Sequence, residues 1–363
     1  MKKVIIIGSG FAGLSAACFL AKSGYHVTVL EKHNLPGGRA RKLVKDGFTF
    51  DMGPSWYWMP DVFERFFSQF NKQVKDYYVL KRLDPSYRVY WNDCILDVPA
   101  EYVKLKLKFE SLEKGSSLKL DNFLKEAAYK YNTGINNLVF KPGESVLELL
   151  DWNVIKGLFK LDVFNSIKSH VAKFFKNPRI KQLLEFPVLF LGALPEKTPA
   201  LYSLMNYADI ILGTWYPEGG MFRIVESMYQ LAGELGVEFL FNHDVKQINI
   251  RNGIAVSITA HDSGGLLKDI SADIVVGAAD YHFVETTLLQ PSFRSYSSRY
   301  WNSRKLAPSC FIYYVGLNKK LNNVLHHSLF FDESFQEHAK DIYLKPAWPT
   351  DPLFYVCAAS QTD

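Results

Sequence analysis

The first thirty residues hold the feature that most constrains the fold of this 363-residue chain. An apolar run, Val4 to Ile7, is followed at once by a cluster of glycines and then by helix-forming residues that end near Gly24. A second apolar run, His26 to Leu30, comes directly after them. Short apolar runs rich in β-branched residues are typical of buried parallel strands. Strand, helix and strand within about thirty residues predict the unit that begins a doubly wound α/β domain.

Three glycines, Gly8, Gly10 and Gly13, lie between the first strand and the helix with the spacing Gly-x-Gly-x-x-Gly. Gly8 permits a tight turn, Gly10 leaves room for a diphosphate, and Gly13 lets the helix pack close to the sheet. The N-terminus of the helix directs backbone N–H groups at the diphosphate. Glu31 follows the second strand, where its carboxylate can accept hydrogen bonds from a ribose. The pattern therefore predicts a dinucleotide site.

A membrane-spanning helix over Val4 to Ala21 is the alternative interpretation of the same residues. Three glycines and two serines within that stretch argue against it, and so does the second strand that follows directly.

Composition fits a folded globular protein, with 48% hydrophobic and 22% charged residues, and the length allows two or three domains. The net charge of +5 does not indicate a nucleic-acid partner. Four cysteines without C-x-x-C spacing predict reduced, mostly buried thiols in a cytosolic compartment. No His/Cys cluster has metal-ligand spacing, and we expect the pair His326-His327 in a solvated loop because neighbouring side chains point apart. We therefore expect no metal. The cysteines are Cys18, Cys94, Cys310 and Cys357.

A second glycine loop, Gly37-Gly38-Arg39, follows Glu31. A guanidinium beside a diphosphate makes charge-assisted hydrogen bonds, which favours a cofactor role for Arg39, although an ordinary surface turn has the same composition. The alternation of Phe48, Phe50 and Met52 with polar or small residues predicts a strand that ends at Gly53-Pro54.

Four motifs, taken in order along the chain, resemble those of the amine-oxidase-type flavoproteins. They are the glycine triplet, Glu31, Pro36-Gly37-Gly38-Arg39 and Phe50-Asp51-Met52-Gly53-Pro54. Four further stretches are similar to the bacterial-type phytoene desaturases, and the resemblance runs from about residue 3 to the end of the chain. The pattern Tyr216-Pro217-x-Gly219-Gly220 is the more specific part, because the first motifs are common to the whole superfamily. The four stretches are SWYWMP (55–60), LDPSYRVY (83–90), WYPEGGM (215–221) and ADIVVGAAD (272–280).

The resemblance implies FAD as cofactor and oxidation of a CH–CH group in a carotenoid precursor, with phytoene towards lycopene as the expected reaction. The flavin would take a hydride from an allylic carbon while a proton leaves the neighbouring carbon. We name no catalytic base. Trp56, Tyr57 and Trp58 are expected at the substrate entrance, with core packing as the alternative. The expected cofactor residues are Gly8, Gly10, Ala12, Gly13, Glu31, Lys32, Gly38, Arg39, Gly53, Pro54 and, through its backbone, Val245.

Two other kinds of protein fit the same motifs. One is a related flavoenzyme with a different substrate, such as a hydroxycarotenoid desaturase, a retinol-saturase-like enzyme or an amine oxidase. The other is a non-catalytic, prenyl-binding escort protein of the GDP-dissociation-inhibitor type. The glycine triplet together with Glu31 and Arg39 favours a bound flavin over the escort protein.

The expected architecture is a doubly wound, Rossmann-like FAD-binding domain (1–80 and 206–285) interleaved with an α+β substrate domain (81–205 and 286–363). The resemblance also implies a further C-terminal FAD segment in the relatives. We expect that segment to be missing here, so that this chain alone binds FAD poorly. Helices are predicted over 61–70, over 118–131 with Ser116 or Ser117 as cap, and over 222–235. Strands are predicted within 82–98 and over 237–240, 243–250, 254–259, 272–276, 311–316 and 353–357.

Residues 153–191 combine apolar residues at helical spacing with seven Lys/Arg against three acids from Asp151 to Glu185, which accounts for +4 of the net charge. A basic amphipathic helix of this kind suits a membrane surface. A core helix with a solvated lysine face is the alternative, and the sequence leaves both open. On the first interpretation the chain is cytoplasmic, attaches peripherally to the cytoplasmic membrane and draws a long apolar polyene from it. The apolar positions are Ile155, Leu158, Phe159, Val163, Ile167, Val171, Phe174 and Phe175.

Overall fold

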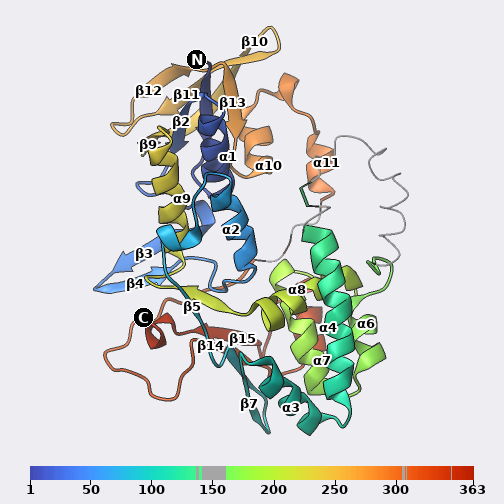
Figure 1. Cartoon of the computed structure of the whole chain (residues 1–363). Helices are drawn as coiled ribbons and strands as arrows, with labels where there is room; N and C mark the ends of the chain where they lie inside the picture. The colour runs from blue at the N-terminus through green and yellow to red at the C-terminus, as the bar shows by residue number, and fades with distance from the viewer. Residues whose placement is uncertain (136–138, 141–160, 305–306, 308, 345) are drawn as a thin grey trace. The chain divides into compact units, whose positions relative to one another are not determined.

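The structure is a computed structural model that describes residues 1–135, 139–140, 161–304, 307, 309–344 and 346–363 (Figure 1). The chain divides into two compact units. Unit 1 comprises Met1–Ser55, Phe63–Leu80 and Pro217–Lys305, and unit 2 comprises Trp56–Val62, Lys81–Tyr216 and Leu306–Asp363. The predicted assignment of cofactor binding to one domain and of substrate binding to the other stays a prediction.

Unit 1 is built on a four-stranded parallel sheet with the order β13-β1-β2-β9. β1 (Lys3–Ile7) pairs with β13 (Ile274–Gly277) and with β2 (His26–Glu31), and β2 pairs with β9 (Glu238–Phe241). Helix α1 (Phe11–Lys22) connects β1 to β2, and α9 (Phe222–Glu234) leads into β9. Val4 to Ile7 are buried, as a continuous apolar run predicts. The parallel α/β fold expected from the sequence is confirmed.

A second sheet of unit 1 consists of β10 (Asp244–Arg251), β11 (Ile254–His261) and β12 (Leu267–Ser271), all antiparallel. The predicted hairpin between β10 and β11 is confirmed, and Asn252 and Gly253 both have positive φ, as a tight two-residue turn requires. Val245 and Ile258 of this sheet pack with Ile5 and Leu30 of the parallel sheet in one apolar cluster. This contact places the start of β10 beside the end of β2.

The remaining elements of unit 1 are short. They are β3 (Lys42–Lys45), β4 (Phe48–Asp51), α10 (Tyr281–Phe283), α11 (Ser298–Asn302) and the short helical turns at 38–40, 74–76, 284–288 and 291–293. Helix α2 (Pro60–Ser68) and the strands β5 (Leu80–Arg82) and β8 (Trp215–Pro217) contain points at which the chain passes from one unit to the other.

Unit 2 contains a mixed four-stranded sheet with the order β15-β14-β6-β7. β14 (His327–Phe330) runs parallel to β6 (Tyr87–Tyr90) and antiparallel to β15 (Phe354–Cys357), and β6 pairs with β7 (Ile95–Val98). One apolar core joins this sheet to the helices, with Phe109, Phe123 and Phe186 among its buried rings. The helices are α3 (Tyr102–Leu112), α4 (Ser116–Thr133), α6 (Ile167–Phe174), α7 (Pro178–Glu185), α8 (Leu204–Tyr207) and α12 (Phe335–Ala339), with short turns at 186–191, 200–203, 208–212, 340–344 and 359–361.

Three local predictions are wrong. The stretch 311–316 is not a strand, and Phe311, Tyr313 and Val315 are exposed. Helix α4 forms as predicted, but neither serine caps it: the N-cap is Gly115, and the hydroxyl of Ser116 is buried without a hydrogen-bond partner among the described residues. The thiols are also less buried than expected, because only Cys18 is buried while Cys310 and Cys357 are exposed.

The basic segment 153–191 is described from Leu161 onward, so Ile155, Lys156, Leu158, Phe159 and Lys160 lie outside the described residues. In the described part, α6 and α7 bury their apolar residues Ile167, Val171 and Ile180 in the core of unit 2. Lys173 and Lys176 lie on the solvated side. The apolar face of these two helices therefore contributes to the core. Among the helices that the structure describes, none is both long enough and apolar enough to cross a bilayer.

Candidate functional site

The turn between β1 and α1 admits only glycine at two of its positions. Gly8 has a φ of +101°, and its N–H donates to the carbonyl of Leu30 at 2.8 Å. A Cβ atom on Gly13 would lie 2.0 Å from the carbonyl oxygen of Gly8. Close packing of helix on turn thus accounts for Gly13, and the left-handed conformation accounts for Gly8.

Gly10 is different, because packing within the protein does not explain it. A Cβ atom on Gly10 would have the Cα of Gly38, at 3.9 Å, as its only non-local neighbour within 4 Å among the described residues. Gly10 is the N-cap of α1, and in the described chain no side chain caps this helix and its first turn holds no acid. The N–H of Gly37 donates to the carbonyl of Ser9 at 2.9 Å, which brings the second glycine loop against the first. Two bare glycine backbones beside a helix N-terminus fit a diphosphate.

Glu31 is only 5% exposed, and its carboxylate is tied to the glycine turn. Oε2 accepts hydrogen bonds from the N–H of Ser9 at 3.0 Å and from its hydroxyl at 2.7 Å, and Oε1 accepts from the N–H of His33 at 3.0 Å. A carboxylate has about four lone-pair positions, so capacity remains for a ribose hydroxyl. Glu31 therefore holds the shape of the turn as well as offering the acceptor that the sequence predicts.

Arg39 and Gly53, both predicted cofactor residues, are brought together. A Cβ atom on Gly53 would lie 2.4 Å from the carbonyl oxygen of Arg39, and the φ of Gly53 is +108°. The guanidinium of Arg39 is exposed and lies 3.2 Å from the carboxylate of Asp280. Asp280 ends the last motif quoted above, so this surface ion pair joins two motifs that are 241 residues apart.

Asp51, which the sequence analysis did not single out, lies beside Gly220 and the start of α9. Its carboxylate accepts hydrogen bonds from the N–H of Met221 at 2.7 Å and of Phe222 at 2.9 Å, and so caps the N-terminus of α9. A Cβ atom on Gly220 would lie 3.0 Å from the same carboxylate. Burial raises the pKa of Asp51, and the two N–H bonds oppose that shift. An acid ending a strand and a glycine pair before a helix were the signals that could have found this contact.

The other predicted cofactor residues occupy different settings. Val245 is buried in β10, close to the point where the N–H of His243 donates to the carbonyl of Glu31 at 2.9 Å. Ala12 and Lys32 are exposed, and Pro54 is half-buried. The structure thus brings Gly10, Gly38 and the turn held by Glu31 together in unit 1, with Val245 on the strand that adjoins the end of β2.

The predicted entrance residues lie in an aromatic cluster within unit 2. The ring of Trp56 stacks on that of His327, with centroids 4.0 Å apart and planes at 7°, and lies 5.3 Å from the ring of Trp58. Rings of Tyr87, Phe186, Phe190 and Tyr355 surround Trp56 at 5.4 to 6.1 Å. Tyr57 is fully buried, and its carbonyl accepts from the N–H of Trp215, so core packing explains Tyr57.

A buried acid positions one of these tryptophans. Trp58 Nε1 donates to the hydroxyl of Thr214 at 2.9 Å, and that hydroxyl donates to Asp209 at 3.0 Å. The hydroxyl of Tyr87 donates to the other oxygen of Asp209 at 2.8 Å. Burial raises the pKa of Asp209 to about 6, against the opposing effect of these hydrogen bonds. Sequence spacing gave no signal for Asp209, because only Thr214 is near it in the sequence, whereas Tyr87 lies 122 residues away.

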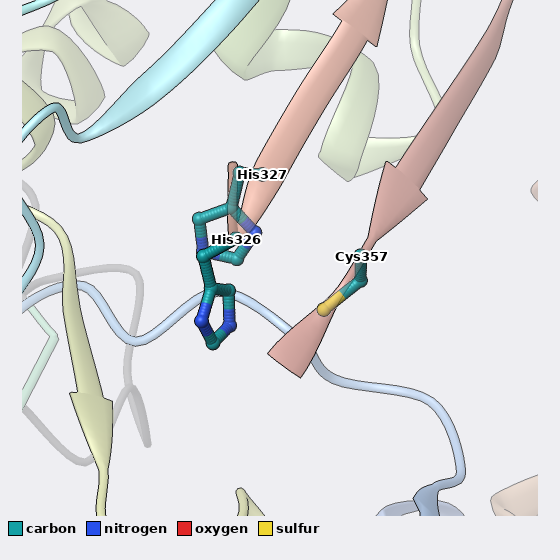
Figure 2. A group of neighbouring side chains, drawn as sticks. All are labelled: His326, His327 and Cys357. Carbon is teal, nitrogen blue, oxygen red and sulfur yellow. The ribbon is translucent and has the colours of Figure 1, made fainter. Parts of the chain in front are cut away.

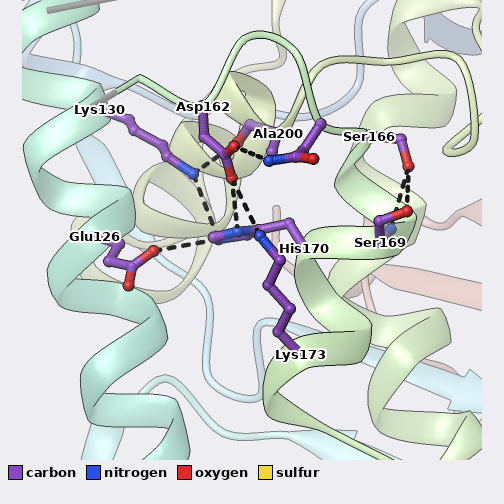
Figure 3. A network of polar contacts seen from close by, with 9 residues as sticks. Glu126, Lys130, Asp162, Ser166, Ser169, His170, Lys173 and Ala200 are labelled. Carbon is purple, nitrogen blue, oxygen red and sulfur yellow. Dashed lines mark hydrogen bonds and ion pairs between the residues drawn. The ribbon is translucent and has the colours of Figure 1, made fainter. Parts of the chain in front are cut away.

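A second buried polar network joins α4 to α6 (Figure 3). Lys130 is 1% exposed; its ammonium donates to the carbonyl of Ala200 at 3.0 Å and lies 3.3 Å from Nε2 of His170. Nδ1 of His170 is 3.1 Å from Asp162, a Coulombic contact without hydrogen-bond geometry. Burial lowers the pKa of Lys130 and lowers that of His170 to about 4. The network fastens two helices together inside unit 2.

His326 and His327 correct a prediction, because both are buried rather than in a solvated loop, with exposed fractions of 5% and 0%. Burial lowers the pKa of His326 to about 4 and that of His327 well below the usual value. His326 also packs edge-on against the ring of Tyr216, with centroids 4.5 Å apart.

Comparison with known proteins gives curated relatives over the whole chain. A carotenoid 3,4-desaturase of Haloarcula japonica is 38% identical over 362 residues, covering 99% of this chain and 72% of that protein. A zeta-carotene-forming phytoene desaturase of Myxococcus xanthus is 30% identical, covering 100% of this chain and 69% of that protein.

Solved structures share the fold. A crystal structure of a Pyrococcus furiosus protein matches with a TM-score of 0.54 at 18% identity, covering 84% of this chain and 66% of that chain. Putrescine oxidase bound to putrescine matches with a TM-score of 0.52 at 16% identity, covering 80% and 60%. The family model of flavin-containing amine oxidoreductases matches residues 11–337. With the glycine turn, the second glycine loop and Glu31 in place, FAD is the cofactor, and the chain belongs to the family of flavin-containing amine oxidoreductases.

Proposed function

We propose that this chain is an FAD-dependent desaturase that oxidises a CH–CH group of a long carotenoid polyene. The observation that supports it best is the 38% identity to a carotenoid 3,4-desaturase, which extends over 99% of the chain and hence over both units. We assign cofactor binding to unit 1, where the two glycine loops meet, and substrate binding to unit 2, where the aromatic cluster lies.

When bound, the flavin supplies the hydride acceptor: the substrate loses a hydride from one carbon and a proton from its neighbour, and a double bond forms between them. Gly10 leaves space for the diphosphate, and Glu31 fixes the turn that carries Gly10. Gly38 packs against this turn, because a Cβ atom on Gly38 would lie 3.2 Å from the Cα of Gly10. Trp56 and Trp58 offer flat apolar surface to a polyene, and Asp209 fixes the orientation of Trp58 through Thr214. Such surroundings exclude water from a reacting apolar chain.

Two substrates compete within this proposal. Phytoene, oxidised towards lycopene, is the expectation from the sequence motifs. The higher identity to a 3,4-desaturase (38%) than to a phytoene desaturase (30%) favours a more desaturated carotenoid that is oxidised at the 3,4 position.

Expressing the chain in cells that accumulate phytoene, and separately in cells that accumulate lycopene, distinguishes the two substrates. Extracted pigments with additional conjugated double bonds identify the accepted substrate, and the Gly10→Val variant is the control without flavin. A flavin-containing protein that changes neither carotenoid but oxidises an amine or another lipid would replace the proposal. A preparation with no flavin absorption in the visible range, yet with bound prenyl lipid, would favour the escort-protein alternative.

We further propose that the chain takes its substrate from the cytoplasmic membrane surface, to which it attaches peripherally. A long hydrocarbon is essentially insoluble in water, so a bilayer is its reservoir. The apolar faces of α6 and α7 are used in the core, so attachment would rest on exposed lysines such as Lys173 and on Phe164, which is 80% exposed. Electrostatic attachment of this kind requires anionic lipid and weakens with salt.

A further inference from the structure

Three side chains with metal-binding chemistry meet at one end of β14 (Figure 2). His326 precedes β14, His327 begins it, and Cys357 lies directly opposite His327 on β15. One donor atom from each of the three lies within 4.8 Å of the others. Side chains directly opposite on antiparallel strands extend from the same face of the sheet, and Figure 2 shows the sulfur of Cys357 turned toward the two rings.

Each imidazole is held through one nitrogen only. Nδ1 of His326 lies 2.6 Å from the hydroxyl of Thr362, and Nδ1 of His327 lies 2.6 Å from the hydroxyl of Tyr355. The Nε2 atoms of both rings are buried and have no hydrogen-bond partner among the described residues. Burial of an unpaired polar atom costs free energy, so a missing partner is the expected explanation. Histidines that bind metals are commonly held in this way, by one nitrogen from an outer partner.

We propose that His326, His327 and Cys357 bind a divalent zinc-class ion through two imidazole nitrogens and one thiolate. Two nitrogens and one sulfur match the preference of Zn²⁺, and a thiol that binds it releases its proton to solvent. Cys357 is exposed, so the ion can enter from solvent, and a water molecule can complete a tetrahedral shell.

The geometry is close to what ligation requires. Donor atoms around a tetrahedral zinc are about 3.3–3.8 Å apart, because the metal–ligand bonds are about 2.0–2.3 Å long. The distances between the three donor atoms, which are now at most 4.8 Å, therefore shorten by at most about 1.5 Å when the ion binds. Side-chain rotations can supply that change. The bound ion would join β14 to β15 beyond their backbone hydrogen bonds.

The test is a titration of the reduced, metal-free 363-residue protein with Co²⁺, a coloured substitute for Zn²⁺. We expect one Co²⁺ per chain with a sulfur-to-metal charge-transfer absorption, and displacement by Zn²⁺. Cys357→Ser should abolish that absorption and weaken binding by at least about 100-fold, since it removes a ligand. Cys310→Ser is the matched control, because Cys310 is also exposed but lies outside the cluster.

Thr362→Val tests whether the outer partner of His326 matters. It should weaken metal binding by about 10-fold while the charge-transfer absorption remains, because the three ligands are intact. Circular dichroism of both variants checks that the fold is kept, and neither side chain is part of the buried core. Absence of the absorption in the parent protein, or its persistence in Cys357→Ser, would overturn the proposal.

Discussion

The carboxylate of Asp51 accepts a hydrogen bond from the N–H of Met221, which lies 170 residues further along the chain, at 2.7 Å. One strand end thereby caps the helix α9, and two of the motifs that carry the family resemblance become neighbours. Replacing Asp51 by Ala should lower the free energy of unfolding by about 1–2 kcal/mol, the usual cost of losing a helix cap. Asp51→Asn should lose less, because its amide oxygen still accepts. Denaturant unfolding of both variants checks this order of stabilities. Equal stability of Asp51→Ala and the parent would contradict the capping role of Asp51.

Gly10→Val should remove bound flavin. The side chain would occupy the space beside Gly38 that the diphosphate needs, where a Cβ atom meets only the Cα of Gly38, at 3.9 Å, among the described residues. Flavin released by heat and measured per mole of protein is the readout. Gly233→Ala is the matched control, because its Cβ atom meets no atom within 4 Å among the described residues. Full flavin content in Gly10→Val would show that the site lies elsewhere.

Glu31→Ala should weaken flavin binding and also destabilise unit 1. It removes the acceptor for three hydrogen bonds, two from Ser9 and one from His33, and a hydrogen bond to a charged group contributes about 1.5–3 kcal/mol. Flavin content and unfolding are measured together. Loss of flavin with an unchanged free energy of unfolding would mean that the carboxylate binds the ribose but does not stabilise the turn.

Asp209 should make stability depend on pH in a defined direction. Its folded-state pKa of about 6 lies above the ordinary value, so the buried acid favours folding while it is protonated. That contribution is present at low pH and is lost as the pH rises through about 6. Asp209→Asn stays neutral, so the parent should lose stability relative to this variant between about pH 4 and pH 6. A constant difference in unfolding free energy over that range would refute the assignment.

His170 should act in the opposite direction. Its pKa is lowered to about 4 in the folded state, so the neutral ring favours folding. The contribution is present above the ordinary pKa of about 6.5 and is lost as the pH falls toward 4. His170→Gln should flatten the acid side of the stability profile relative to the parent protein. Identical profiles for the parent and for His170→Gln would count against a buried neutral His170.

Membrane attachment is tested by liposome flotation of a variant with Lys156, Lys160, Lys168 and Lys173 changed to Glu. We expect the parent to float with anionic vesicles at low salt and the variant to remain below. A second variant has the same net charge as the first and controls for the effect of charge alone. In it, four lysines outside the segment are changed to Glu: Lys45, Lys246, Lys268 and Lys340. Equal flotation of the parent and the first variant would exclude the segment as the contact.

The elements of unit 1 could be predicted because their signals are local. The spacing from Gly8 to Gly13 and the Asn252-Gly253 turn each specify backbone geometry over a few residues. Asp51 and Asp209 were not found in this way, because Asp51 accepts from Met221, 170 residues away, and Asp209 accepts from Tyr87, 122 residues away.

The errors have the same origin. The stretch 311–316 is rich in aromatic and β-branched residues, as strands are, but a strand forms only where a neighbouring edge accepts its hydrogen bonds, and none of the described sheets includes it. His326 and His327 were expected apart because consecutive strand residues point to opposite faces. His326 precedes β14 and is free of that alternation, so the two rings lie 4.4 Å apart.

The order β13-β1-β2-β9 also determines when this sheet can be completed during synthesis. β1 and β2 leave the ribosome among the first 31 residues, but their outer neighbours end at residues 241 and 277. At roughly 5–20 residues per second, both edges of the β1–β2 pair wait about 10–50 s for partners. Unpaired apolar edges are where chains aggregate. The β1–β2 pair therefore keeps both of its edges unpaired throughout the synthesis of residues 81–216, which belong to unit 2.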